Sequence, residues 1–359
     1  MKLRVVHCGT GVSGKHAARA ILAQPHLELV GMRVYDPRKA GRDAGELVGS
    51  PPTGVTATQD MDALLALEPD CLTYFGDPFT HPKPGIEDVT CFLARGTDVV
   101  TPTFMPLLHP PSAPAELREP VERACRQGGS SFYCSGIEPG FVDCQLAIDL
   151  LSMADQVSEI RVQEIGNYSK DLNVFAMQEI FGFGAPLDKA TLLRTSSMGQ
   201  FIWGACIRVI ADALGRTVER IDAVCETAAF HRDLETASGP VPAGTIAAVR
   251  YEMSGVVAGQ RLFVIEHVLR MHPDAAPQWE VAHGGQGAVP FHQHRVIITG
   301  RPSLSCSLDT AAGDETINHG FALVAMRLVN AIPIVHKAKT GILGQLEIAR
   351  YSKHDWPIP

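Results

Sequence analysis

The sequence lacks a long apolar run, an excess of basic residues and any closely spaced pair of cysteines, and each absence excludes a class of protein. No segment reaches the roughly 18 to 20 consecutive apolar residues that a membrane-spanning helix needs. The N-terminal apolar stretch meets Gly9 too early for a signal peptide, so we expect a cytoplasmic protein without a membrane partner. The net charge of -8 argues against a nucleic-acid partner, because phosphate binding needs a basic surface.

The nine cysteines are odd in number and include no Cys-x-x-Cys pair, so buried thiols are the default interpretation. His292 and His294 flank Gln293, and such a pair can bind a metal on one face of a strand. Because no third ligand is evident beside them, we expect no metal.

A chain of 359 residues is long enough for two domains. Its first part alternates between expected strands and helices, beginning with a strand over 3–8, a helix over 15–24 and a strand over 27–35. This order continues to about residue 135 and predicts a doubly wound parallel sheet, the α/β architecture of a Rossmann domain, over residues 1–150.

The pattern changes after residue 155, where residues 158–164 and 245–257 alternate like half-buried antiparallel strands. Residues 261–270 and 295–299 also read as strands. We therefore expect a second α+β domain over residues 151–319, built on a mostly antiparallel sheet. A helix at about 320–350 would return to the first domain.

The turn after the first strand carries the motif Gly-x-Gly-x-x-Gly in the segment Gly9, Thr10, Gly11, Val12, Ser13 and Gly14. Gly9 permits a tight turn, Gly11 lets the backbone approach a pyrophosphate, and Gly14 lets the helix pack closely on the strand. The strand before it, the helix after it and an acid about twenty residues on supply the context that this motif requires. A glycine-rich turn without a ligand is the alternative interpretation.

That acid is Asp36, which closes the second strand and suits the two ribose hydroxyls of NAD. Arg38, Lys39 and Arg42 follow, and they are suited to the 2′-phosphate of NADP or to a solvated loop. The expected cofactor is therefore NAD or NADP, and Asp36 slightly favours NAD.

Several segments, taken together, resemble the family of NAD(P)-dependent reductases that contains 2,4-diaminopentanoate dehydrogenase and the amine dehydrogenases, which has dihydrodipicolinate-reductase-like members. The matching segments occur in the family's order and are residues 9–14, 36–45, 136–141, 181–184, 266–270 and 329–333. The resemblance implies hydride transfer to or from a small carbonyl, imine or amine carbon. It also implies a homodimer whose second domain supplies much of the substrate pocket and the dimer sheet.

One departure from the family pattern concerns the loop after Thr101. The resemblance implies a Glu in this loop that activates the amine or the attacking water. Residues 102–110 read Pro-Thr-Phe-Met-Pro-Leu-Leu-His-Pro and contain no carboxylate. Amine chemistry therefore does not carry over automatically to this chain.

Three residues are candidates for proton transfer or for polarising the substrate. Glu138 follows a strand at the sheet edge where ligands of such folds bind, although it is also placed to cap a helix. His109 occupies the loop where the family has its Glu, and imidazole ionises near neutrality; a surface histidine is the alternative. Tyr168 follows a strand of the second domain, and a packed aromatic is the alternative there.

Other polar residues lie within expected strands. Glu164, Glu266 and His267 are of this kind, and strand carboxylates are more often solvated or paired across strands than catalytic. Apolar side chains in both domains suit either a substrate pocket or an ordinary core. They are Phe104, Met105, Leu107, Leu108, Phe141, Phe175, Met177, Phe181 and Trp203.

These observations predict an NAD(P)-dependent oxidoreductase, similar to amine dehydrogenases, that acts on the C–N or C=N bond of a small, mostly apolar substrate. Two alternatives remain open at this point. One is a reductase for preformed imines or carbonyls that lacks the amine-activating Glu. The other is a dinucleotide-binding sensor without catalysis.

Overall fold

A computed structural model describes residues 2–77, 82–195, 197–283, 292–310 and 319–348. The chain divides into two compact units. The first comprises Met1–Gly140 and Phe321–Pro359, and the second comprises Phe141–Gly320. Among the helices of the described residues, none combines the length and apolar character needed to cross a bilayer.

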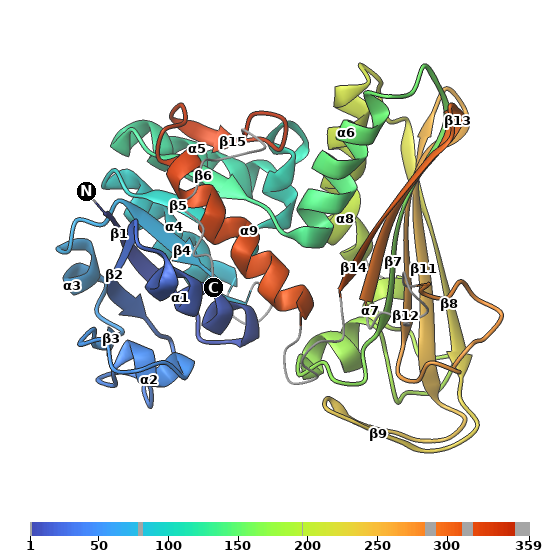
Figure 1. Ribbon diagram of the computed structural model, residues 1–359, viewed down its shortest axis with the longest axis horizontal. Helices are drawn as coiled ribbons and strands as arrows, with labels where there is room; N and C mark the ends of the chain where they lie inside the picture. The colour runs from blue at the N-terminus through green and yellow to red at the C-terminus, as the bar shows by residue number, and fades with distance from the viewer. Residues whose placement is uncertain (1, 78–81, 196, 284–291, 311–318, 349–359) are drawn as a thin grey trace. The chain divides into compact units, whose positions relative to one another are not determined.

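The first unit is built on a parallel sheet of seven strands in the order β15-β6-β5-β4-β1-β2-β3 (Figure 1). Its strands are β1 (Leu3–Cys8), β2 (Leu27–Arg33), β3 (Ala57–Thr58), β4 (Cys71–Tyr74), β5 (Asp98–Thr101), β6 (Ser131–Cys134) and β15 (Gly341–Leu343). The order 3-2-1-4-5-6 within it is that of a Rossmann sheet, whose ligand crevice opens beyond the carboxyl ends of the central strands. The predicted doubly wound α/β fold is confirmed.

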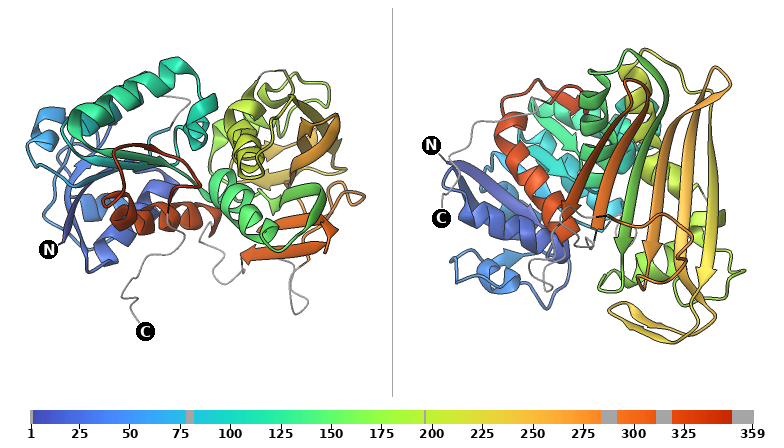
Figure 2. Two further views of the ribbon diagram at one scale, coloured as in Figure 1. Left: turned by 90° about the horizontal axis from the view of Figure 1, so that it is seen from above. Right: turned by 45° about the vertical axis from the view of Figure 1, so that its right-hand side comes forward.

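Helices cover both faces of this sheet (Figure 2). They are α1 (Val12–Ala23), α2 (Ala44–Val48), α3 (Met61–Leu65), α4 (Pro82–Ala94), α5 (Ala115–Gly128) and α9 (His319–Val335). The C-terminal part of the chain belongs to this core, because Leu328 and Ile332 of α9 are buried in one cluster with Val5 of β1 and Ile21 of α1. Strand β15 then pairs in parallel with β6.

The second unit contains a six-stranded sheet in the order β14-β13-β7-β12-β11-β8. Its strands are β7 (Gln156–Asn167), β8 (Arg220–Ala229), β11 (Ile246–Val257), β12 (Gln260–Arg270), β13 (His292–Arg301) and β14 (Leu304–Thr310). The central pair, β7 and β12, is parallel, and the other pairs are antiparallel. The expected α+β unit on a mostly antiparallel sheet is thus confirmed, with one parallel pair that the alternation of residues did not reveal.

Helices of the second unit lie over one face of its sheet (Figure 1). They are α6 (Ala147–Leu151), α7 (Leu192–Thr195) and α8 (Met198–Ala213), with an irregular helical segment at Ala176–Ile180. A further irregular segment, Ile137–Leu146, begins in the first unit and ends in the second. A small ribbon of β9 (Leu234–Thr236) and β10 (Gly239–Val241) completes the unit. Since side chains alternate along a strand, successive residues of each strand face in turn the helices and the open side of the sheet.

Candidate active site

The glycine turn between β1 and α1 has the geometry of a dinucleotide cradle. Gly9 has a φ of +112°, and a Cβ there would lie 2.5 Å from the carbonyl oxygen of Phe75. A Cβ on Gly14 would lie 2.3 Å from the Gly9 carbonyl oxygen, so these two positions need glycine for the fold itself. A Cβ on Gly11 would meet nothing within 4 Å, so this position leaves open space beside the backbone.

The start of α1 also suits an anionic group. Gly11 is the N-cap and provides no side-chain hydrogen bond to the first turn, and that turn contains no acidic residue. The N–H groups and partial positive charge of the helix N-terminus are therefore available to a phosphate. Together with the open space at Gly11, this fits the pyrophosphate of NAD or NADP.

His7 holds the glycine turn in place, a role that sequence analysis missed. Its Nε2 lies 2.7 Å from the Gly9 carbonyl oxygen, and its Nδ1 lies 2.8 Å from Thr73 Oγ1. Since a carbonyl only accepts, Nε2 donates to it, and the neutral ring then accepts the Thr73 hydroxyl proton at Nδ1. Burial lowers the pKa of His7 to about 4, which keeps the ring neutral. The only sequence signal was a histidine in the apolar strand directly before the motif.

The residues after β2 are linked by polar contacts. Asp36 forms an ion pair with Arg38, with Arg38 Nη2 2.8 Å from Asp36 Oδ2. Lys39 Nζ donates to Thr10 Oγ1 at 2.7 Å, so its ammonium group reaches the glycine turn. Asp36, Arg38, Lys39 and Thr10 are thus brought together in one part of the first unit.

Two of the predicted catalytic candidates belong to the first unit. Glu138 follows β6 and has an extended backbone, with a φ of -153°, so it does not have the conformation of a helical residue. His109 is buried, and its Nδ1 lies 2.8 Å from Ser112 Oγ in the tight turn that the two residues share. Both remain predictions as catalytic groups.

The third candidate, Tyr168, belongs to a buried polar cluster of the second unit. We call Glu164, Tyr168, His267 and His292 the histidine cluster. Tyr168 donates its hydroxyl hydrogen to Glu164 Oε1, and His267 Nδ1 lies 3.1 Å from Glu164 Oε2. His292 Nδ1 lies 3.7 Å from Glu164 Oε1, and its ring meets the Tyr168 ring edge-on at 4.8 Å.

Strand register explains why these residues meet. Glu164 of β7 is paired with His267 of β12, and Gly166 of β7 is paired with His292 of β13. Residues two apart on a strand share a face, so all of these positions lie on one side of the sheet. Gly166 provides room, because a Cβ there would lie 2.5 Å from His292 Nδ1.

The cluster holds a charge inside the protein. Burial alone would raise the pKa of Glu164, but hydrogen bonds with His267 and His292 and the charge of nearby His294 keep this pKa well below its ordinary value. The groups that hold the carboxylate ionised are therefore histidine side chains. From the sequence, Glu164 and His267 are expected to be solvated or paired across strands; in the structure they are paired and buried.

Trp203 of α8 packs on the same cluster. Its ring lies 4.2 Å from the His267 ring and 5.6 Å from the Tyr251 ring. Its Nε1 is buried and has no hydrogen-bond partner among the residues that the structure describes. A donor is therefore available beside the ion-paired carboxylate and imidazole groups.

Some of the apolar residues considered as pocket residues have packing roles instead. Leu107 and Leu108 are fully buried in the first unit. The Phe104 ring stacks on the Tyr74 ring at 5.7 Å. These contacts explain the three side chains without a substrate.

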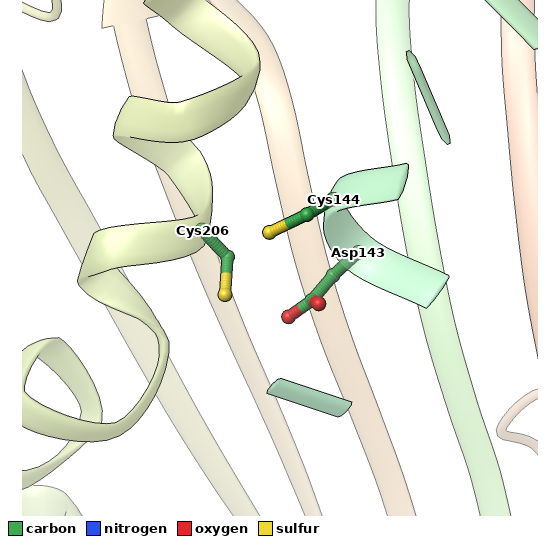
Figure 3. Close-up of side chains that lie close together, drawn as sticks. All are labelled: Asp143, Cys144 and Cys206. Atoms are coloured by element: carbon green, nitrogen blue, oxygen red, sulfur yellow. The ribbon is translucent and has the colours of Figure 1, made fainter. Parts of the chain in front are cut away.

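A second buried cluster joins Asp143 and Cys144 to Cys206 of α8, with their ligand atoms all within 4.8 Å of one another (Figure 3). Burial raises the pKa of the Cys206 thiol well above its ordinary value, and its contacts with Cys144 and Asp143 act in the same direction. The cluster is thus a buried part of the core of the second unit.

The opposite face of the second sheet carries a band of ion pairs. Arg161 Nη1 lies 2.9 Å from Glu252 Oε2 and 2.8 Å from Glu266 Oε2, and Arg250 Nε lies 2.7 Å from Glu266 Oε1. A hollow of about 470 Å³ lies over this band. Its lining residues are Glu159, Arg161, Val224, Glu226, Arg250, Glu252 and Arg261.

Comparison with known proteins adds a family assignment. Residues 141–352 match the family model described as the 2,4-diaminopentanoate dehydrogenase C-terminal domain. The chain is 36% identical to an amine dehydrogenase of Streptomyces virginiae, an alignment that covers 95% of this chain and 94% of that protein.

Solved structures share the fold. The amine dehydrogenase of Mycobacterium smegmatis superposes with a TM-score of 0.74 at 19% identity, covering 99% of this chain and 98% of that one. A scyllo-inositol dehydrogenase of Lactobacillus casei, solved with bound NAD(H), gives a TM-score of 0.54 at 14% identity, covering 93% and 89%.

Proposed function

Because this chain belongs to the 2,4-diaminopentanoate dehydrogenase family, we propose that it interconverts a small amine with its carbonyl compound and ammonia, using NAD or NADP. The observation that carries this proposal is the buried, ionised carboxylate of Glu164 within the histidine cluster. The glycine turn of the first unit supports the cofactor assignment. When bound, the nicotinamide ring supplies the site that accepts or donates the hydride.

A buried carboxylate suits amine chemistry because the reacting species are cations. The amine arrives as an ammonium ion, and removing a hydride from the adjacent carbon produces an iminium ion. A fixed negative charge in a water-poor site stabilises a positive charge that develops during the reaction. Glu164 would supply that charge, and it would take the role of the carboxylate that residues 102–110 lack.

Oxidation of the amine releases one proton and one hydride, and water then replaces the nitrogen. The ammonium group loses one proton to give the free amine, and loss of a hydride gives the iminium ion. Water then adds to the iminium carbon, and the C–N bond breaks to give the carbonyl compound and ammonium. His267 is the proposed proton acceptor in the first step, since its Nδ1 contacts Glu164 and its ring can shuttle protons near neutrality.

Tyr168 would orient the carboxylate. Its hydroxyl donates to Glu164 Oε1 while His267 contacts Oε2, so each carboxylate oxygen has a separate partner. This arrangement would fix the orientation of the carboxylate. Tyr168 thus remains a proposed site residue, with a positioning role.

The proposal is tested by following oxidation of NADH and NADPH with a panel of small aldehydes and ketones, with and without ammonium. We expect oxidation that depends on ammonium and is lost in the Glu164→Gln variant. Turnover of carbonyl compounds without ammonium would instead assign a carbonyl reductase. Turnover of cyclic imines alone would assign an imine reductase, and tight nucleotide binding without any turnover would assign a sensor.

We further propose that the chain forms a homodimer through the ion-pair band on the open face of the second sheet. This face carries arginine and glutamate side chains in one patch, and Val224 within it is 56% exposed. A patch with both signs of charge is self-complementary in a two-fold contact, where an arginine of one copy meets a glutamate of the other. The helices that cover the opposite face leave this one available.

Light scattering coupled to size-exclusion chromatography tests the homodimer. The wild-type chain should elute with twice the mass of one 38.6 kDa chain. Val224→Asp should shift the equilibrium toward monomer, because it places a charge where an exposed apolar side chain would be buried in the contact. A monomeric wild-type protein at micromolar concentration would contradict the proposal.

A further inference from the structure

The carboxylate after β2 is already occupied by a neighbouring side chain. Arg38 Nε lies 3.0 Å from Asp36 Oδ1 and 3.2 Å from Oδ2, while Arg38 Nη2 lies 2.8 Å from Oδ2. The backbone N–H of Arg38 also donates to Oδ1 at 2.9 Å. Both oxygens that the ribose hydroxyls of NAD would need therefore accept from a guanidinium.

This pair changes what Asp36 does to a ligand. A free carboxylate repels a 2′-phosphate, but a carboxylate bound to a guanidinium forms a neutral pair. The contacts with Arg38 lower the pKa of Asp36 to about 2, so the carboxylate is ionised at neutral pH. Arg38 uses its Nε–Nη2 edge on Asp36, and its side chain is 89% exposed, so its Nη1 donors remain accessible.

Lys39 adds a second positive charge at the same place, and it forms no ion pair with the residues that the structure describes. Its Nζ donates to Thr10 Oγ1 at 2.7 Å, which fixes the ammonium group against the glycine turn that would cradle the pyrophosphate. Asp36, Arg38 and Lys39 together carry a net positive charge. A net positive site favours the extra phosphate of NADP over the neutral hydroxyl of NAD.

We propose that this site selects NADPH over NADH, with Lys39 and Arg38 binding the 2′-phosphate and Asp36 positioning Arg38. The inference rests on the proposed function, since it assumes that the glycine turn binds a nicotinamide dinucleotide. It reverses the slight preference for NAD that Asp36 suggests in the sequence. The reason is geometric: the carboxylate that would select NAD is engaged by the guanidinium two residues later.

Direct titration tests the proposal without relying on turnover. The fluorescence of the dihydronicotinamide ring gives dissociation constants for NADH and NADPH on the purified full chain. Wild type should bind NADPH about 10-fold or more tightly than NADH, as expected for charge-assisted hydrogen bonds to a phosphate. Added salt should weaken NADPH binding more than NADH binding.

Variants separate specific contacts from general charge. Lys39→Ala should weaken NADPH binding about 10-fold and change NADH binding less than about twofold. Arg38→Ala should weaken NADPH binding and strengthen NADH binding, because it releases the Asp36 carboxylate. Lys2→Ala is the matched control: it removes the same charge before β1, at the strand end away from the glycine turn, and should change neither constant.

Two outcomes would overturn the inference: tighter or equal binding of NADH by the wild-type protein, or equal effects of Lys39→Ala on both nucleotides. Either result, combined with amine turnover, would leave the proposed function intact. NADPH selectivity without turnover of any amine would support this inference and contradict the proposed function. Failure to bind either nucleotide would overturn both.

Discussion

Glu164 and His267 face each other across two parallel strands, with His267 Nδ1 3.1 Å from Glu164 Oε2 in the buried interior of the second unit. This pair places a carboxylate and an imidazole side by side in a buried part of the second unit. It also gives the chain a carboxylate that its loop at 102–110 lacks.

Replacing Glu164 by Gln should abolish most amine turnover while keeping the fold. The amide is isosteric but neutral, so it no longer stabilises an iminium ion, and we expect kcat/KM to fall about 100-fold or more. Glu235→Gln, an exposed residue of β9, is the control and should retain wild-type activity. Retained activity in Glu164→Gln would contradict the role proposed for the carboxylate.

Removing the Tyr168 hydroxyl should change the pH dependence of kcat/KM while leaving the fold intact. Tyr168→Phe deletes the donor to Glu164 Oε1, so the pKa of Glu164 should rise. The acid limb of the kcat/KM profile should then move to higher pH. An unchanged acid limb with reduced kcat would indicate that Tyr168 only packs against its neighbours.

Gly166 should tolerate no side chain. A Cβ there would lie 2.5 Å from His292 Nδ1, so Gly166→Ala should displace the imidazole, lower activity and destabilise the fold by about 1 to 3 kcal/mol. Gly204→Ala on α8 is the matched control. A Cβ at Gly204 would have no contact closer than 3.6 Å, and alanine favours a helix by up to about 1 kcal/mol. Chemical denaturation and assays of both variants give the comparison.

The three glycines of the turn should respond differently to alanine. Gly11→Ala should fold normally but weaken nucleotide binding, because its new methyl group enters the open space that the pyrophosphate needs. Gly9→Ala should be strongly destabilised, since it combines a φ of +112° with a close contact to Phe75. Wild-type affinity of Gly11→Ala for both nucleotides would contradict the placement of the pyrophosphate beside Gly11.

His7 should make the fold sensitive to acid. Its pKa is about 4 in the folded protein against an ordinary value of 6.5, so the unfolded chain takes up a proton first as the pH falls. The free energy of unfolding should therefore decrease between pH 6.5 and 4, by about 3 kcal/mol from this residue. The contribution of His7 to the free energy of unfolding should be fully present above pH 6.5.

His7→Gln separates this contribution from that of other groups. The glutamine amide has a donor for the Gly9 carbonyl but does not titrate in this range. Urea denaturation of wild type and variant at pH 7, 6 and 5 should give a shallower pH dependence for the variant. Parallel slopes would show that His7 does not account for the acid sensitivity.

The fold of the first unit was accessible from the sequence because its signals are local. The glycine motif, the strand before it and the helix after it lie within 25 residues of one another. The helix nevertheless begins at Val12, three residues earlier than predicted, because Gly11 serves as the N-cap. In the second unit, β8 and β14 were not predicted. Exposed residues dominate β8 and weaken its apolar alternation. Strand β14 does alternate between half-buried and exposed residues, so its signal was present in the sequence and was missed.

The amino-acid sequence by itself determined the Rossmann unit and the dinucleotide turn, since both depend on residues at short, fixed spacings. It also determined the family of this protein, since the matching segments follow one another in the family's order along the chain. Only the tertiary structure decided which side chains meet. Glu164 and His267 lie 103 residues apart, and strand register alone makes them partners. The side-chain conformation of Arg38 likewise decides whether Asp36 is available to a ribose, because a guanidinium bound to the carboxylate occupies the oxygens that would accept hydrogen bonds from the ribose hydroxyls.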